Sequence, residues 1–236
     1  MNYLLNLENS LWRYERKYVY ENAFAHAVER EVRHSRYVFH TAYPPRWVNN
    51  LYLDTKSLTS FFANVNGIDE RIKCRIRWYG DFEIANTEAT LEFKVKKGLI
   101  GTKLSYPLKS FSPKQGLTLL DLEDCFKQSE LPDEIRNYLL FVEPVVVNRY
   151  HRQYFLSFDR KFRLTIDKDV EFSNLIHLST NSFSAMQRLP QIIVELKYDR
   201  SVATEAKPVF EEFHSRLSKS SKYVSGITAL YPHMIS

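Results

Sequence analysis

Apolar and charged residues alternate along several short segments of this chain. The clearest case is DERIKCRIRWYG at residues 69–80, where Lys73, Arg75 and Arg77 occupy every second position and apolar residues fill the positions between them. In an extended strand, successive side chains point to opposite faces. This segment therefore predicts a strand with one cationic face and one apolar face.

The same alternation recurs on most of the other predicted strands. Strands are expected at residues 13–20, 47–55, 69–80, 87–98, 101–108, 145–158, 162–172 and 191–199. Their charged faces carry Arg13, Glu15, Lys17, Glu92, Lys94, Lys96, Arg163, Asp167, Glu195 and Lys197, with a weaker pattern around Arg152. Helices are expected at 22–37, 56–67, 113–141, 203–218 and near the C-terminus. Strands and helices mix without βαβ regularity, so we predict an α+β fold with antiparallel strand pairs.

The recurrence of charged faces favours a closed barrel. A single alternating strand usually has a solvated polar face, but an open sheet with so many like charges on one face would repel itself. Exposed ion pairs recover only about 0–1 kcal/mol each. A closed antiparallel β-barrel instead turns its apolar faces outward under helices and its charged faces inward. Unpaired cations inside it cost roughly several kcal/mol per ion, so the pattern predicts a cationic tunnel for a polyanionic ligand.

The charged residues have the chemistry of phosphate binding. Arginine forms bidentate bonds with phosphate oxygens, and lysine supplies a point charge. The carboxylates among the cations, Glu15, Glu92, Asp167 and Glu195, could hold a divalent metal ion through oxygen ligands. Asp167 could instead orient the arginines, and Asp54 is expected to cap the helix that follows it.

Composition limits the other possibilities. The chain has 236 residues and a formal net charge of +5, which suits an anionic partner without identifying it. Its two cysteines, Cys74 and Cys125, form no metal-ligand pattern and no disulfide framework. Neither a signal peptide nor an apolar run long enough to cross a membrane is seen. We expect one domain over residues 1–236, a cytoplasmic location and no nucleic-acid partner, because Trp78 and Phe93 alternate away from the cations.

Seven segments, in chain order, resemble the VTC domain family. They are RYERKYVY, NNLYLDT, DERIKCRIRWYG, LEFKVKKGLIGTK, NRYHRQYF with FRLTIDKD, VELKYD and SKYVSGI, running from about residue 13 to 229. This family is the polyphosphate polymerase domain of the vacuolar transporter chaperone complex, and it also occurs in free-standing bacterial proteins. It belongs to the triphosphate tunnel metalloenzymes, which are relatives of the CYTH proteins. The resemblance implies a tunnel of about eight antiparallel strands, in agreement with the barrel predicted from the charge pattern.

The resemblance also implies site residues. The cations of the family's tunnel that we expect to act in catalysis fall on Lys17, Arg75, Arg77, Lys94, Arg152, Arg163 and Lys222. Substrate-binding roles are expected for Lys103, Lys197, Ser221 and Glu15, with Lys96 and Lys97 as competing matches for Lys103. The metal-binding glutamate corresponds to Glu195, and Glu92 is the second metal ligand that we expect. The metal would be Mn²⁺ or Mg²⁺.

One departure from the related hydrolases bears on the activity. The CYTH hydrolases carry E-x-E-x-K on the first strand, whereas this chain has Arg13-x-Glu15-x-Lys17, so a cation replaces a carboxylate. This difference agrees better with the polymerase branch. The membrane segments and the inositol-phosphate-binding domain of the eukaryotic complex are not found in this sequence. Coupling of synthesis to translocation would therefore need a membrane or regulatory partner protein.

The leading hypothesis is a polyphosphate polymerase. It would transfer the terminal phosphate of a nucleoside triphosphate, with ATP as the expected donor, to a growing polyphosphate chain or to pyrophosphate. The cations would neutralise the charge that develops on the transferred group. Two alternatives stay open: a metal-dependent triphosphatase of the same fold, and a non-catalytic module that binds polyphosphate or nucleotide.

Overall fold

The architecture is that of a computed structural model, which describes residues 7, 10–83, 88–113, 117–174 and 186–234. The strands are β1 (Arg13–Glu21), β2 (His40–Asp54), β3 (Glu70–Tyr79), β4 (Ala89–Lys97), β5 (Ile100–Leu108), β6 (Glu143–Leu156), β7 (Phe162–Asn174), β8 (Gln187–Leu189) and β9 (Gln191–Asp199). The α-helices are α1 (Ala25–His34), α2 (Thr59–Val65), α3 (Leu119–Gln128), α4 (Asp133–Leu139), α5 (Lys207–Phe210) and α6 (Lys222–Leu230). Short 3-10 helices are η1 (Asn22–Phe24), η3 (Arg200–Glu205) and η4 (Pro232–Met234).

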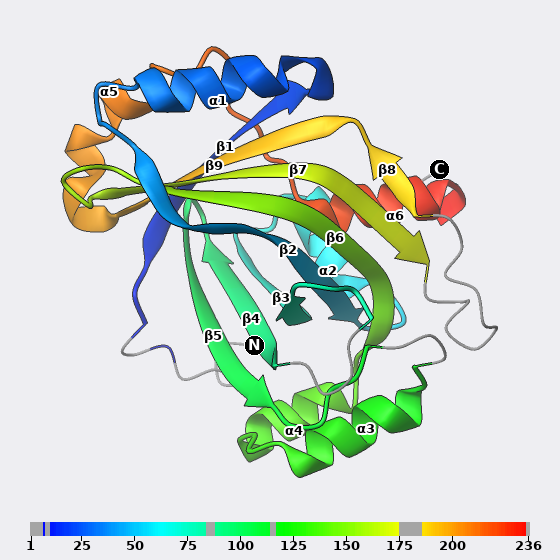
Figure 1. Ribbon diagram of the computed structural model, residues 1–236. Helices are drawn as coiled ribbons and strands as arrows, with labels where there is room; N and C mark the ends of the chain where they lie inside the picture. The colour runs from blue at the N-terminus through cyan, green and yellow to red at the C-terminus, as the bar shows by residue number, and fades with distance from the viewer. Residues whose placement is uncertain (1–6, 8–9, 84–87, 114–116, 175–185, 235–236) are drawn as a thin grey trace.

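Eight of these strands close into a ring. Their order is β6-β2-β3-β4-β5-β1-β9-β7, and β7 pairs with β6 to complete the circle. Every pairing is antiparallel, and β8 adds to β7 outside the ring. The closed antiparallel barrel and the α+β class predicted from the sequence are confirmed (Figure 1).

The weakest seam of the ring lies between β1 and β5. Within the described residues it has two register pairs, Arg13 with Gly101 and Tyr14 with Ile100. By contrast, β1 pairs with β9 along its whole length. Most of the β1 edge that faces β5 is therefore left for another part of the chain.

The segment 215–221, which precedes α6, covers part of this edge. Leu217 forms a bridge with Tyr18, and the Ser218 amide donates to the Lys17 carbonyl at 2.8 Å. The helix predicted over 203–218 is therefore wrong in its second half. Its backbone groups bond to β1 instead of to each other, and α5 ends at Phe210.

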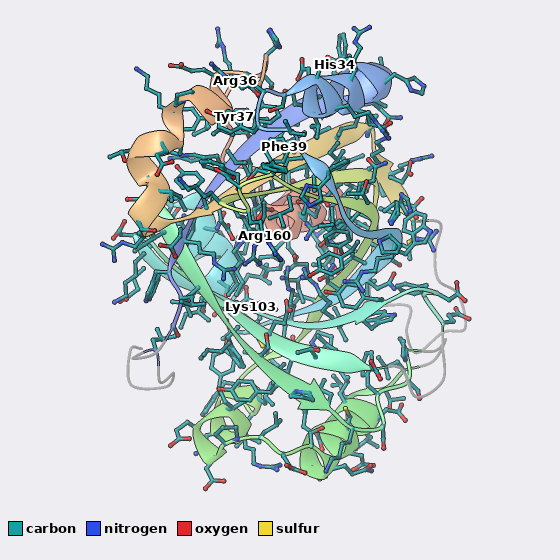
Figure 2. The ribbon with its side chains drawn as sticks, turned by 60° about the vertical axis from the view of Figure 1, so that its left-hand side comes forward. His34, Arg36, Tyr37, Phe39, Lys103 and Arg160 are labelled. Atoms are coloured by element: carbon teal, nitrogen blue, oxygen red, sulfur yellow. The ribbon has the colours of Figure 1, made fainter. Side chains whose placement is uncertain are left out.

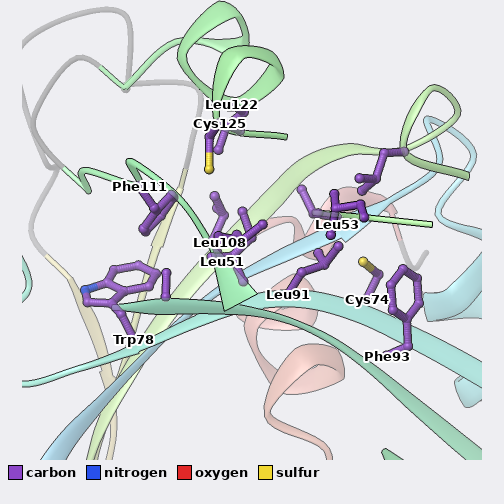
Figure 3. Packing of buried hydrophobic residues seen from close by; sticks show 14 of the residues in the cluster. Leu51, Leu53, Cys74, Trp78, Leu91, Phe93, Leu108, Phe111, Leu122 and Cys125 are labelled. Carbon is purple, nitrogen blue, oxygen red and sulfur yellow. The ribbon is translucent and has the colours of Figure 1, made fainter. Parts of the chain in front are cut away.

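Two apolar cores lie outside the ring, between the strands and the covering helices. One packs under α3 and α4, and Figure 3 shows it with Leu51, Leu53, Cys74, Trp78, Leu91, Phe93, Leu108, Phe111, Leu122 and Cys125 labelled. The other packs under α1 and α5 and includes Val28, Val32, Leu164, Val194, Leu196 and Val209. The apolar faces of the strands are thus the outer wall, as predicted.

Helix α6 is placed differently, because it packs on strand residues from the opposite face. Tyr223 and Ile227 of α6 share a core with Tyr52 and Tyr150, which lie on the inner side of β2 and β6. Gly226 permits this approach, since a Cβ atom there would lie 2.5 Å from the ring of Phe172. The close contact holds the middle of α6 against Phe172 and Val146, inside the ring.

Asp54, at the end of β2, connects α2 with α6. Its carboxylate accepts the backbone amides of Ser60 and Phe61 at 3.0 Å each and the Tyr223 hydroxyl at 2.5 Å. The predicted role of Asp54 as a cap of the following helix is confirmed. Because the same carboxylate anchors Tyr223, it also fixes the residue next to Lys222.

Candidate functional site

The inner face of the ring gathers charged side chains from seven strands and from the start of α6. Among them are Glu15, Lys17, Lys73, Arg75, Arg77, Glu92, Lys94, Lys103, Arg152, Asp167, Glu195, Lys197 and Lys222. Alternation explains this gathering, because the neighbours of these residues on each strand form the outer cores. In Figure 2, Lys103 is labelled near the middle of the view, where it extends from β5.

Glu92 of β4 is the centre of one ion-pair network. Its carboxylate lies 2.7 Å from Arg75 Nη2, 3.5 Å from Arg77 Nη1 and 2.6 Å from Lys103 Nζ. Glu92 is 2% exposed. Burial alone would raise its pKa, but the three cations outweigh that effect and hold the pKa well below its usual range. The carboxylate is therefore ionised at neutral pH.

Asp167 of β7 is the centre of a second network. It accepts two hydrogen bonds from the Arg152 guanidinium, at 2.6 and 2.7 Å, and one from Lys222 Nζ at 2.5 Å. Burial acts to raise the pKa of Asp167, and the two cations lower it to about 2. Asp167 thus orients a tunnel arginine, which is one of the two roles considered for it from the sequence.

Tyr150 links the two networks and was missed by the sequence reasoning. Its hydroxyl accepts a hydrogen bond from Arg77 Nη2 at 3.2 Å, and its ring lies under Lys222 Nζ, 4.4 Å from the centroid. Burial would raise the pKa of Tyr150, but Arg152, Arg77 and Lys222 lower it to about 8. The signal was available, because Tyr150 precedes Arg152 by two residues and therefore shares its strand face.

Asn50 of β2 is a second residue that the sequence reasoning missed. Its amide oxygen accepts from Arg77 Nε at 2.9 Å, and its amide nitrogen donates to Asn148 at 2.8 Å. Together with Glu92 and Tyr150, it fixes the orientation of the Arg77 guanidinium. A neutral side chain within a strand carries no charge pattern, so the periodicity of cations could not reveal it.

Glu15 and Glu195 form a third group, on β1 and β9. Lys94 Nζ lies 2.7 Å from Glu15, and Lys197 Nζ lies 3.0 Å from Glu195 Oε1. Burial raises the pKa of each carboxyl, and neighbouring lysines lower it, to about 2 for Glu15 and well below the usual range for Glu195. Glu195 Oε1 is buried and, within the described residues, makes no hydrogen bond of normal geometry. Besides its ion pair with Lys197, that oxygen can accept a further ligand.

The start of α6 brings two of the predicted residues to the inside. Ser221 caps the helix, and its hydroxyl accepts a hydrogen bond from Lys73 Nζ at 2.7 Å. Lys222 follows and reaches Asp167. The anchoring of Tyr223 to Asp54 therefore positions both side chains.

The structure brings most of the predicted site residues together, with Arg163 as the main exception. Arg163 is exposed and lies opposite Lys197 in the register of β7 and β9. Lys103 is also partly exposed, but it bonds Glu92. Lys97, which competed with Lys103 in the sequence, lies on the outer side and pairs with Glu70 at 2.6 Å.

The described residues contain no group of three or more His, Cys, Asp or Glu side chains that could hold a metal ion by themselves. Mg²⁺, however, is commonly bound by one or two carboxylates together with substrate phosphates and water. Glu195, whose Oε1 lies 3.0 Å from Lys197 Nζ but makes no hydrogen bond among the described residues, and the nearby Glu15 fit such a partial site. Across the part of the chain that the structure describes, no helix is long and apolar enough to cross a membrane.

Comparison with known proteins identifies the family. The family model of the VTC domain matches residues 12–231, so the chain belongs to the VTC domain family. No curated protein matches it.

Solved structures share the fold at low sequence identity. A putative adenylyl cyclase from Hippeastrum, described as having a dominant triphosphatase activity, aligns with a TM-score of 0.52 and 10% identity over 93% of this chain and 96% of the other. A conserved hypothetical protein from Pyrococcus furiosus gives 0.51 and 11% over 91% and 99%. A protein from Pyrococcus horikoshii gives 0.50 and 13% over 90% and 97%. At these identities the likeness concerns the fold alone.

Proposed function

We propose that this chain is a polyphosphate polymerase that transfers the terminal phosphate of ATP to a growing polyphosphate chain. The observation that carries the proposal is the closed ring whose interior gathers lysine and arginine side chains around ionised, buried carboxylates. Membership of the VTC domain family supports the same reading. A polyphosphate chain is a ligand of matching charge and shape, and as acceptor it supplies its own nucleophilic oxygen.

The cations have distinct tasks in this mechanism. Phosphoryl transfer depends mainly on positioning and on stabilising the charge of the transferred group. Arg75, Arg77 and Arg152 are held by carboxylates and hydrogen bonds, so they are oriented before a ligand arrives. Lys94 adds charge from β4. Burial lowers the pKa of Lys17, on β1, to about 7, and a bound phosphate would favour its charged form. These pre-oriented groups bind the donor phosphates and neutralise the transferred one.

A divalent metal ion, Mn²⁺ or Mg²⁺, is part of the proposal. Glu195 would hold it, with Glu15 as the neighbouring carboxylate, and the ion would supply charge neutralisation to the phosphate oxygens. Glu92 stays a predicted metal ligand, but its carboxylate already bonds three cations. We therefore give Glu195 the main role. Replacing Glu195 with Gln should abolish turnover while leaving the outer cores intact.

The direct test is incubation of the purified protein with ATP and Mn²⁺, followed by gel electrophoresis of the products. A ladder of polyphosphate supports the polymerase. Release of orthophosphate alone overturns it in favour of a triphosphatase, the activity ascribed to the Hippeastrum protein of similar fold. Neither product would indicate a module that only binds the anion. The Glu195→Gln variant is the control for contaminating activity.

A further inference from the structure

A group of cations lies at the open end of the β3–β4 hairpin, next to the turn that joins β4 to β5. The networks around Glu92 and Asp167 do not explain it. Arg71 and Lys73 lie on the inner face of β3, and Lys96 lies on the inner face of β4. We call these three residues the hairpin cluster. In the register of the two strands, Arg71 is directly opposite Lys96, and Lys73 is opposite Lys94. Like charges directly opposite each other destabilise a strand pair, so this arrangement needs a reason.

The hairpin cluster lacks the carboxylates that neutralise the other cations. Within the described residues, no ion pair joins a carboxylate to any of its three members, whereas Lys94 pairs with Glu15. The hydrogen bonds of the cluster go to neutral oxygens, from Lys73 to the Ser221 hydroxyl and from Arg71 to the Ile68 carbonyl. Arg71 Nε is buried without a hydrogen-bond partner. The donors of the cluster are therefore available to an anion.

The electrostatic environment of Lys73 leads to the same conclusion. Burial lowers its pKa well below the usual value, and the charges of Lys17, Lys94, Arg71 and Lys96 lower it further. Among the described residues these leading influences all disfavour the charged form. A bound anion would reverse that balance, because it would favour the charged form of every lysine around it.

The cluster also continues the row of phosphate-binding residues on β3. Arg77, Arg75, Lys73 and Arg71 share one face at intervals of two residues. A strand rises about 3.3 Å per residue, so this row spans about 20 Å between its end Cα atoms. A triphosphate bound at Arg75 and Arg77 would leave the far end of the row unused. A longer linear phosphate chain would reach it.

We propose that the hairpin cluster is a second anion subsite, which binds the part of a linear polyphosphate chain that lies beyond the first three phosphates. The subsite makes the protein select long chains over tripolyphosphate. The inference rests on the proposed function in taking polyphosphate as the ligand. Its own content, a preference for chain length located in Arg71, Lys73 and Lys96, concerns binding and needs no turnover.

The test compares the binding of tripolyphosphate and of a longer linear polyphosphate of defined length by isothermal titration calorimetry, without nucleotide or metal. The proteins are the wild type, Lys73→Gln, Lys96→Gln and the matched control Lys97→Gln. Lys97 adjoins Lys96 in sequence but lies on the outer side, paired with Glu70. We expect the wild type and the control to bind the longer chain more tightly. Each cluster variant should lose about tenfold in affinity for the longer chain, as for one charge-assisted hydrogen bond, with tripolyphosphate unaffected.

Equal losses for both ligands, or no loss for either, would overturn the subsite. The gel assay with ATP separates this failure from a failure of the proposed function. If the wild type makes polymer but the variants keep full preference for the long chain, only the subsite is wrong. If the wild type makes no polymer but the variants lose that preference, the subsite stands and the polymerase does not. Near-ultraviolet circular dichroism of each variant verifies that it is folded.

Discussion

Two regions inside the same ring hold their cations in different ways. The paired centre, formed by Glu92 and Asp167 with their arginines and lysines, is neutralised by the protein's own carboxylates. The hairpin cluster of Arg71, Lys73 and Lys96 has cations opposite cations and bonds to neutral oxygens. The first arrangement orients its donors in the absence of a ligand. The second gains its compensating charge only when an anion binds.

The difference follows from what each region has to do. Reacting phosphates must be held in one geometry, so a fixed guanidinium such as that of Arg152, bonded twice by Asp167, is useful there. A passing chain needs attraction without a fixed register, and lysine, a point charge on a flexible stem, suits that task. Substitution of one residue in each region tests whether the two regions hold their cations differently.

The largest effect is expected from Asp167→Asn in the paired centre. The substitution leaves Arg152 and Lys222 buried without their counter-charge, and breaking a buried pair costs about 3–5 kcal/mol. We expect the free energy of unfolding, measured by urea denaturation, to fall by about 3 kcal/mol or more. The control is Glu130→Gln, which removes a solvent-exposed pair with Lys109. Similar small losses for both variants would mean that the paired centre is not a structural unit.

Arg75→Ala should remove most of the activity. Loss of one pre-oriented donor to a developing charge typically lowers kcat by about 100-fold to 1,000-fold, and we expect at least the lower figure in ATP-dependent polymer synthesis. Lys109→Ala, an exposed cation outside the ring, serves as the control. Full synthesis by Arg75→Ala would show that the inner face is not the reaction site.

The pH dependence of stability should report Tyr150. Its pKa of about 8 in the folded protein lies below the ordinary value near 10. Between these pH values the folded state releases the proton and the unfolded state keeps it. Stability therefore rises by about 2 kcal/mol as the pH increases from 8 to 10, and the gain is lost as the pH falls through 8.

The Tyr150→Phe variant isolates this contribution. Denaturant unfolding of the wild type and of the variant across this pH range should differ by the predicted increment, and the tyrosinate absorbance near pH 8 should be absent from the variant. Parallel stability curves would contradict the lowered pKa. Saturation with tripolyphosphate should raise the titration midpoint in the wild type, because the ligand neutralises Arg77 and Arg152.

The smallest change in the free energy of unfolding is expected in the hairpin cluster, and it is an increase instead of a decrease. Lys73→Gln removes a half-buried cation that lies opposite Lys94 and has no carboxylate partner among the described residues, so the free protein should become more stable by about 1 kcal/mol. Addition of the long polyphosphate should reverse the order, because the wild type then gains more from binding. Thermal unfolding with and without the anion measures both. A destabilised variant in the absence of anion would show that Lys73 acts as a structural residue.

The strands and their two faces could be predicted from the sequence, because the alternation of apolar and charged residues is a property of a few neighbouring positions. The segment 69–80 already separates the cationic face from the apolar face, and Cys74 and Trp78 are buried in the outer core as expected. The helix prediction over 203–218 fails in its second half, since Leu217 and Ser218 bond to the edge of β1, a partner about 200 positions away in the chain. No local periodicity records such a partner.

For the site, the sequence determined which side chains share a face and, through the VTC resemblance, which cations belong to the tunnel. The tertiary structure alone decided how they are compensated. Glu92 takes three cations, Asp167 takes two, and the hairpin cluster takes no carboxylate among the described residues. The pairs of Arg75 with Glu92 and of Arg152 with Asp167 depend on the register of consecutive strands. Lys222 reaches Asp167 only because α6 packs inside the ring, and Coulomb energies are set by such distances in space.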